Sequence, residues 1–195
     1  KNRVVLFYFF GIFAYVGAEQ GISYWMSKFL QIYHGIDPAS QGASAVANFW
    51  GLMTIGGLFG LVLLKLLDSK KVLIGFTILS IVSFSIALFA NTEMSIVAFQ
   101  SCGFFLSVMY PIIISLALNS FLKNHGSFAG ILMTAIVGGA IVQLLIGLLS
   151  DIFTLKLGMM LVFLCLGYIL SIGYWAKPLV SNKTIGLKEL FKLNK

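Results

Sequence analysis

The chain has 195 residues, of which 59% are hydrophobic and 10% are charged, with a formal net charge of +7. Soluble domains carry about 25% charged residues, so this composition excludes an ordinary soluble domain and predicts an integral membrane protein. The positive charge does not predict a nucleic-acid partner, because the basic residues lie at the ends of apolar runs and are not clustered on one soluble face.

Six apolar segments, each long enough to cross a bilayer as a helix, follow one another along the chain. They are predicted at residues 4–33, 43–67, 72–90, 94–122, 127–150 and 158–176. Helices are the expected spans because they satisfy their backbone groups internally, and the alternating segments of a membrane barrel are absent from the sequence. Residues 1–176 therefore form the predicted six-helix domain.

Residues 177–195 are predicted to be a polar tail, which either lies on the inner leaflet as a short amphipathic helix or stays solvated and frayed. The sequence opens with Lys1 directly before the first apolar run, so we expect a piece of a longer polypeptide.

The basic residues predict the orientation. One side of the membrane would carry only Lys28 and Lys156. The other side would carry Lys1, Arg3, Lys65, Lys70, Lys71, Lys123, Lys177, Lys183, Lys188, Lys192 and Lys195. Since cytoplasmic loops are enriched in lysine and arginine, both termini of this segment are expected in the cytoplasm.

Polar side chains interrupt the middle of the first apolar segment. Tyr15, Glu19 and Ser23 are four residues apart and share one helical face, with Gln20 alongside. An ionised carboxylate at the bilayer centre costs about 2.5–3.5 kcal/mol on insertion scales, so such a group usually faces a protein interior or a water-filled cavity. We interpret this face as a substrate-binding surface whose carboxylate and amide bind hydroxyl groups. The alternative is a protonated Glu19 that is bonded to a neighbouring helix.

Other polar residues lie on the later segments. Asn48 stands near the outer end of the second, Gln100 and Tyr110 lie on the fourth, and Gln143 lies on the fifth. We expect them to contact substrate, although an interfacial role for Asn48 and a structural role for Gln143 stay open. Pro111 removes a backbone hydrogen bond and predicts a bend, which is either a hinge or a static kink.

Small residues predict close helix contacts at two places, Gly56 with Gly60 and Gly138 with Gly139. Such patches let helix backbones approach in lipid, where packing is the main force between helices. They serve packing alone, or they also let helices rock during transport.

No enzyme or metal-site pattern occurs in the sequence. His34 and His125 lie in loops on opposite sides, and the sequence contains no metalloprotease, nucleophile-elbow or phosphate-loop motif. Cys102 and Cys165 lie inside apolar segments and are interpreted as small buried hydrophobic residues. We therefore expect a protein that is not an enzyme and binds no metal.

Three segments resemble a known set of sequences. They are the run from Tyr15 to Glu19, the run from Tyr110-Pro111 to Leu118, and the run from Ala135 to Ile141 that continues to Gly147 and Asp151. In these segments the chain resembles the C-terminal half of the fucose–galactose–proton symporter family, within the major facilitator superfamily. The resemblance spans nearly all of the chain.

The resemblance implies an all-α integral membrane fold of twelve helices, in which each six-helix half contains two inverted three-helix repeats. This chain would supply the second half, and the missing N-terminal six-helix half would be its partner and would hold the main coupling acids. The family implies proton-coupled uptake of a monosaccharide such as fucose, galactose or glucose across the inner membrane by alternating access. No cofactor is expected besides the coupling proton.

Carried over by position, Glu19 and Gln20 fall where the family's seventh helix faces the sugar cavity, and Asn48, Gln100 and Gln143 fall on helices that line it. The chain also departs from the family pattern. Gly57 stands where the family usually has arginine, Gln143 stands where proline is common, and the loop at 68–71 is a reduced form of the usual basic loop. We therefore expect the fifth helix to bend less. A non-transporting sensor of the same fold and a permease for another small polar solute remain as alternatives.

Overall fold

The computed structural model describes residues 2–120 and 125–179. Its elements are α1 (Asn2–His34), η1 (Pro38–Gly42), α2 (Ala43–Leu66), α3 (Ser69–Phe89), α4 (Thr92–Leu106), α5 (Met109–Leu118), α6 (His125–Thr134), η2 (Ala135–Val137), α7 (Gly138–Ile152), α8 (Leu155–Met159) and α9 (Leu161–Trp175). All of these are helical, and the described residues contain no strand. The amphipathic helix predicted near the C-terminus lies outside the described residues.

Six stretches of the described chain are long and apolar enough to cross a membrane. They are Arg3–His34, Pro38–Leu66, Ser69–Phe89, Thr92–Leu118, Gly126–Ile152 and Leu155–Trp175, and we refer to them as the first to sixth spans. The predicted all-α fold with six membrane-spanning helices is therefore confirmed.

Polar capping residues start three of the helices ahead of the apolar runs. Asp68, Asn91 and Thr154 each accept a hydrogen bond from a backbone N–H two or three residues later, at 3.0, 3.1 and 3.2 Å. Such caps satisfy donors that a helix start otherwise leaves unpaired. The third, fourth and sixth spans therefore begin directly after these caps, ahead of the starts that hydropathy predicted.

A short π-helical turn, η1, leads from the first span into the second. Asp37 caps this turn and accepts hydrogen bonds from the Ser40 hydroxyl and from the Ala39 N–H. The Ser40 hydroxyl, and next the Ala39 N–H, hold the pKa of the exposed Asp37 carboxyl below its usual value.

The fourth and fifth spans are both interrupted near their middles. Pro111 lies in the first turn of α5 and cannot bond to the carbonyl of Ser107, and the helix is broken at Ser107–Val108. In the fifth span, a 3-10 turn at Ala135–Val137 separates α6 from α7. The fifth helix is expected to bend less, because Gln143 stands where the family commonly has proline. The fifth span is nevertheless interrupted by this 3-10 turn.

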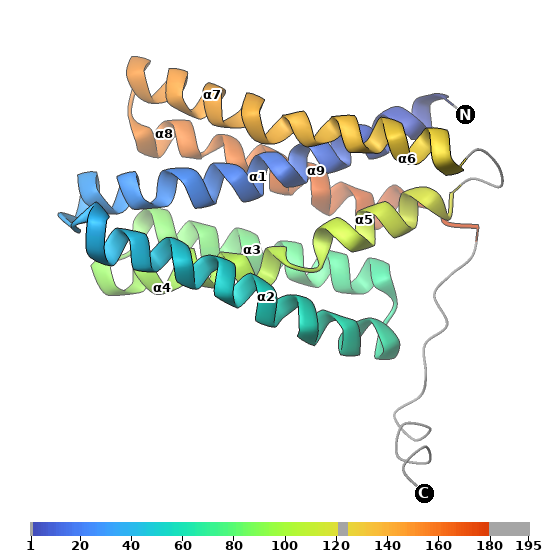
Figure 1. The fold of residues 1–195 in the computed structure, drawn as a ribbon, viewed down its shortest axis with the longest axis horizontal. Helices are drawn as coiled ribbons and strands as arrows, with labels where there is room; N and C mark the ends of the chain where they lie inside the picture. The colour runs from blue at the N-terminus through green and yellow to red at the C-terminus, as the bar shows by residue number, and fades with distance from the viewer. Residues whose placement is uncertain (1, 121–124, 180–195) are drawn as a thin grey trace, which may run out of the picture.

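The spans pair crosswise. The second span packs along the fourth through α2 and α4, and the fifth packs along the first through α7 and α1. The first span also contacts α9 of the sixth span. In the equivalent contact, the fourth span packs against α3 of the third span. Because the fourth span comes three crossings after the first, these two cross the membrane in opposite directions. The contacts are those of two inverted three-helix repeats. In Figure 1, α7 lies at the top, α1 crosses the middle and α2 lies at the bottom.

Glycines let the paired helices approach closely. A Cβ atom at Gly138 would collide with the backbone of Phe13, and one at Gly103 would collide with the backbone of Phe49. A Cβ at Gly56 would lie only 2.5 Å from the Ser107 Oγ. These positions bring α1 against α7 and α2 against α4 at backbone distance, which is the contact that helix association in lipid favours.

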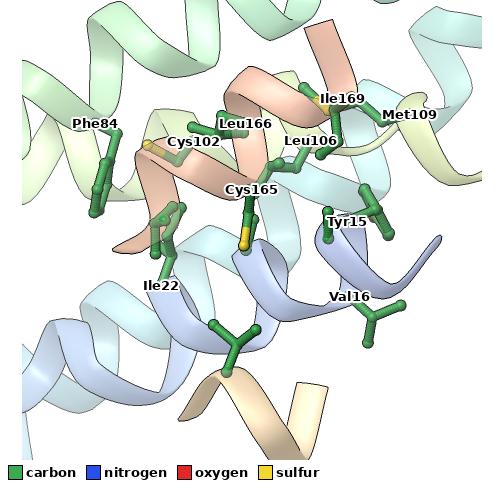
Figure 2. Close-up of a cluster of buried hydrophobic side chains, with 14 of the residues drawn as sticks. Tyr15, Val16, Ile22, Phe84, Cys102, Leu106, Met109, Cys165, Leu166 and Ile169 are labelled. Atoms are coloured by element: carbon green, nitrogen blue, oxygen red, sulfur yellow. The ribbon is translucent and has the colours of Figure 1, made fainter. Parts of the chain in front are cut away.

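The centre of the bundle is filled by apolar side chains from several spans. Figure 2 shows Ile22 of α1, Leu106 of α4, Met109 of α5 and Leu166 of α9 gathered in one cluster. Cys102 and Cys165 belong to the same cluster, and both are buried free thiols, as the sequence predicted.

A cation joins three spans at the end of the bundle where the sixth span begins. The Lys156 Nζ lies 5.8, 5.0 and 5.4 Å from the ring centroids of Phe29, Tyr33 and Phe89. The Lys156 backbone N–H also donates to the Tyr33 hydroxyl oxygen at 3.2 Å. This cage connects the end of α1, the end of α3 and the start of α8.

Candidate substrate-binding site

Glu19 and Gln20 occupy the middle of α1 and face different neighbours. Successive residues of an α-helix point about 100° apart, because one turn contains 3.6 residues. Glu19 lies one turn beyond Tyr15, on the side of α1 that faces the fourth span, and Gln20 lies against the fifth span. Both side chains are half-buried. One stretch of helix therefore presents a carboxyl group and an amide to two different sides.

Two aromatic side chains, Tyr15 and Tyr110, pack together on the side of α1 that carries Glu19. The Tyr15 side chain is 4% exposed, and it lies one helical turn before Glu19 on the same face of α1. The Tyr15 ring lies 5.6 Å from the ring of Tyr110 on α5. The Tyr110 hydroxyl in turn donates to the Met133 Sδ on α6 at 3.7 Å. The cluster thus runs from α1 through α5 to α6, and it lies beside both helix interruptions.

The backbone carbonyl oxygen of Gln20 joins α1 to the fifth span. It accepts a hydrogen bond from the Gln143 Nε2 at 3.3 Å and another from the Ser23 Oγ at 3.4 Å. A Cβ at Gly139 would lie 3.1 Å from the Gln20 Cγ, so α7 closes directly over this part of α1. Ser23 is only 7% exposed, and its hydroxyl is used within its own helix.

The side-chain amides of the predicted site differ in whether they already form a hydrogen bond within the protein. The side-chain amides of Gln20, Asn48 and Gln100 have no hydrogen-bond partner among the described residues. Gln143 uses its Nε2 on the Gln20 carbonyl, which leaves its side-chain oxygen as an acceptor. Gln20, Asn48 and Gln100 are therefore the amides that can turn both donor and acceptor toward a ligand.

Asn48 and Gln100 lie on a second pair of packed helices, α2 and α4. Asn48 is exposed on α2 next to Phe49, whose backbone contacts Gly103, and Gln100 lies one turn from Gly103 on α4. No hydrogen bond in the described part of the chain joins either amide to Glu19 or Gln20. The structure therefore joins the part of α1 that carries Glu19 and Gln20 to neighbouring spans, and it places Asn48 on α2 and Gln100 on α4, outside those contacts.

The sequence did not indicate Met133, and it indicated Tyr15 only as part of the Glu19 face. Tyr15 was placed on the same helical face as Glu19, but its contact with the Tyr110 ring depends on the packing of α5 against α1. Met133 carries no signal in the sequence that distinguishes it from a core residue. Among the described residues, no group of three or more histidine, cysteine, aspartate or glutamate side chains could hold a metal ion.

Comparisons with known proteins identify similar sequences. The chain is 33% identical over 169 residues to a glucose/galactose transporter of Brucella abortus biovar 1 (strain 9-941), covering 84% of this chain and 40% of that protein. It is 26% identical over 140 residues to the L-fucose-proton symporter of Escherichia coli (strain K12), covering 71% of this chain and 32% of the symporter. The chain therefore spans about two fifths of the length of the first of these relatives. No protein-family model matches it.

Solved structures show the same fold. A crystal structure of the major facilitator superfamily transporter FucP in the outward conformation matches with a TM-score of 0.80 at 23% identity, over 91% of this chain and 43% of that chain. A crystal structure of a single-substitution variant of the E. coli fucose:proton symporter FucP matches with a TM-score of 0.82 at 21% identity, over 89% of this chain and 43% of that chain. The chain is thus similar in sequence to a glucose/galactose transporter and to a fucose–proton symporter, and its six spans have the fold of one half of the major facilitator superfamily transporter FucP.

Proposed function

We propose that this chain is the C-terminal half of a proton-coupled monosaccharide permease that works by alternating access in the inner membrane. Two facts support the proposal. The relatives named above are a glucose/galactose transporter and a fucose–proton symporter. The chain covers about two fifths of the first relative and contains half of the transporter fold, so a second six-helix half would complete the protein. Glucose, galactose and fucose are the first substrates to test.

The observation that carries the proposal is the pair of unlike polar groups at the centre of α1. The Glu19 carboxyl group and the Gln20 side-chain amide are half-buried in the middle of a mostly apolar span. A sugar offers hydroxyl groups that both donate and accept hydrogen bonds. A carboxylate and a free amide on adjoining sides of one helix would bind two such hydroxyls in a defined orientation.

In this proposal the sugar lies between the two halves of the transporter. Glu19 and Gln20 would bind it from α1, Asn48 and Gln100 from α2 and α4, and Gln143 through its remaining oxygen. Rocking of one half against the other would open the site to each side of the membrane in turn. The interruptions of the fourth and fifth spans adjoin the Tyr15–Tyr110–Met133 contacts, so these spans would bend where the site closes.

The proton is proposed as the coupling ion, and both termini of the chain are proposed to face the cytoplasm. Glu19 is the sole acid in the interior of the six apolar segments. Moving an ionised carboxylate into a closed apolar site is unfavourable, so a protonated Glu19 would favour closure. Further coupling acids are expected in the other half, so Glu19 acts as a substrate ligand whose charge tunes closure.

Sugar uptake by the complete transporter tests this function. Radiolabelled glucose, galactose and fucose would be offered to cells that express the wild type, Glu19→Gln, Gln143→Ala or Leu164→Ala. Leu164 is the control, because its side chain on α9 is 71% exposed on an apolar surface. We expect a loss of uptake in Glu19→Gln and Gln143→Ala and no change in Leu164→Ala. Absence of uptake of all three sugars by the wild type contradicts the proposal.

A sensor that binds sugar without transporting it is the second candidate. The specific observation is Gly57, which lies where the family usually has arginine and which has no atom within 4 Å of a Cβ built on it. The space that an arginine side chain would enter from α2 is therefore open. Sugar binding to purified protein, without accumulation in vesicles that carry a proton gradient, would favour this function over transport. Competition by a panel of other small polar solutes would identify a different substrate.

A further inference from the structure

A groove of about 530 Å³ lies between α3 and α4, away from the polar cluster on α1. It is lined by apolar side chains that include Leu79, Val82 and Ile86 of α3 and Val97 and Phe105 of α4. Several of these side chains are exposed, with Val97 at 60%. Both helices are membrane spans, so the groove opens toward the bilayer or toward a neighbouring protein.

The two hydroxyl groups that line the groove are already bonded. The Ser83 Oγ donates to the Ala98 carbonyl oxygen at 2.8 Å, and the Ser101 Oγ donates to the Val97 carbonyl oxygen at 2.8 Å. These hydroxyls therefore offer no free donor to an occupant. A polar solute such as a sugar would lose its hydrogen bonds to water in this groove without replacing them, whereas a hydrocarbon chain would lose none.

Glu93 provides the free charge at one end. It lies in the first turn of α4 and lines the groove, and its exposed carboxylate has no partner among the described residues. Phe105, in the last turn of α4, lies at the other end. Phe105 comes twelve residues after Glu93, a separation of about 18 Å along a helix at 1.5 Å per residue. One leaflet of the hydrocarbon core is about 15 Å deep, so the groove matches one leaflet in length.

We infer that this groove binds a phospholipid with a primary ammonium headgroup, such as phosphatidylethanolamine, whose acyl chain lies along α3 and α4 and whose ammonium group binds Glu93. The apolar lining of the groove and its length along α4 both fit an acyl chain. The carboxylate at the mouth selects a cationic donor, because hydrogen bonds between ionised partners are about twice as strong as neutral ones. A quaternary ammonium headgroup carries the same charge without an N–H donor and is bound more weakly.

Native mass spectrometry of the purified protein tests this inference. Dioleoyl phosphatidylethanolamine and dioleoyl phosphatidylcholine would be added in equal amounts, so that the headgroup is the sole difference. We expect phosphatidylethanolamine to be retained about tenfold more, which corresponds to about 1.4 kcal/mol. Glu93→Gln should abolish this preference. Asp151→Asn, which removes another exposed acid near the end of a span, should preserve it.

A second variant tests the groove itself. Val97→Trp places a bulky side chain in the groove from an exposed position, so the fold should be retained, as thermal unfolding will verify. It should reduce the binding of both lipids. Equal retention of the two lipids by the wild type overturns the inference, and so does a preference that survives Glu93→Gln. A dimer without bound lipid, dissociated by Val97→Trp, would assign the groove to a second copy and also overturn it.

Discussion

The Gln143 Nε2 donates a hydrogen bond to the backbone carbonyl oxygen of Gln20 at 3.3 Å and joins the fifth span to the first. Gln143 therefore has a structural role in addition to any contact with substrate. Hydrogen bonds between membrane helices contribute about 0.6 kcal/mol on average, and up to about 1.7 kcal/mol. We expect Gln143→Ala to lower the free energy of unfolding within this range.

Equilibrium unfolding in detergent measures this change. Leu144→Ala is the control, because Leu144 is the next residue on α7 and its side chain is exposed. It should leave the stability nearly unchanged. If Gln143→Ala is no less stable than Leu144→Ala, then the contact with Gln20 does not stabilise the bundle.

Gly56 and Gly57 provide a comparison between neighbouring glycines of α2. A Cβ at Gly56 would lie 2.6 Å from the Phe104 carbonyl oxygen, whereas a Cβ at Gly57 would meet no atom within 4 Å. We expect Gly56→Ala to destabilise the protein by about 1–3 kcal/mol, because it overpacks the contact with α4. Gly57→Ala should be neutral or slightly stabilising, since alanine favours a helix over glycine.

Thermal unfolding of the two alanine variants decides this point. Equal stability of both would show that the contact between α2 and α4 can relax to accommodate a methyl group. Gly60→Ala should behave like Gly56→Ala, because a Cβ there would collide with the Val108 side chain.

The six spans could be predicted from the sequence because hydropathy over about 20 residues is a strong signal. The starts of the helices were less accurate, since Asp68, Asn91 and Thr154 cap them through local hydrogen bonds that hydropathy does not measure. The break in the fourth span is explained by Pro111. The 3-10 turn at Ala135–Val137 contains no proline, and it packs against α1.

The candidate site could be predicted in part. Glu19 and Gln20 stood out because polar residues are rare in apolar spans, and the structure places both near other polar groups. Two contacts could not be predicted: the hydrogen bond from the Gln143 amide to the Gln20 carbonyl oxygen, and the contact between the Tyr15 and Tyr110 rings. Both join spans that are distant in the sequence. A single sequence contains no signal for such contacts. The contacts of Ser23, Asn48 and Gln100 with a substrate stay predictions.

Pro111 is predicted to set the rate of transport. Pro111→Ala would supply an N–H group that can bond to the Ser107 carbonyl and continue the helix from α4 into α5. We expect a lower rate of sugar uptake with nearly unchanged affinity, because the polar side chains stay in place while the bend is lost. Uptake kinetics separate the two quantities. Pro38→Ala, in the loop turn η1, is the control and should leave both unchanged.

Lys156 is predicted to stabilise the end of the bundle where α8 begins. Its ammonium group contacts three aromatic rings, and a cation–π contact contributes about 0.5–1 kcal/mol at an exposed site. Lys156→Gln should therefore lower the free energy of unfolding by about 1–2 kcal/mol. Lys28→Gln is the matched control, because Lys28 bonds only to Gln31 of the same helix among the described residues. Similar stability of the two variants would show that the contacts of Lys156 with the three rings do not stabilise the bundle.

The central claim is that the polar groups of α1 border a water-filled sugar site, and cysteine accessibility tests it most directly. In a protein with Cys102 and Cys165 replaced by alanine, Gln20→Cys and Leu164→Cys would be treated with a membrane-impermeant, charged thiol reagent. Leu164 is highly exposed but lies on an apolar face of α9, so its cysteine should stay unlabelled in lipid. We predict rapid labelling of Gln20→Cys that is slowed by the transported sugar. A Gln20→Cys that is as unreactive as Leu164→Cys would contradict the claim.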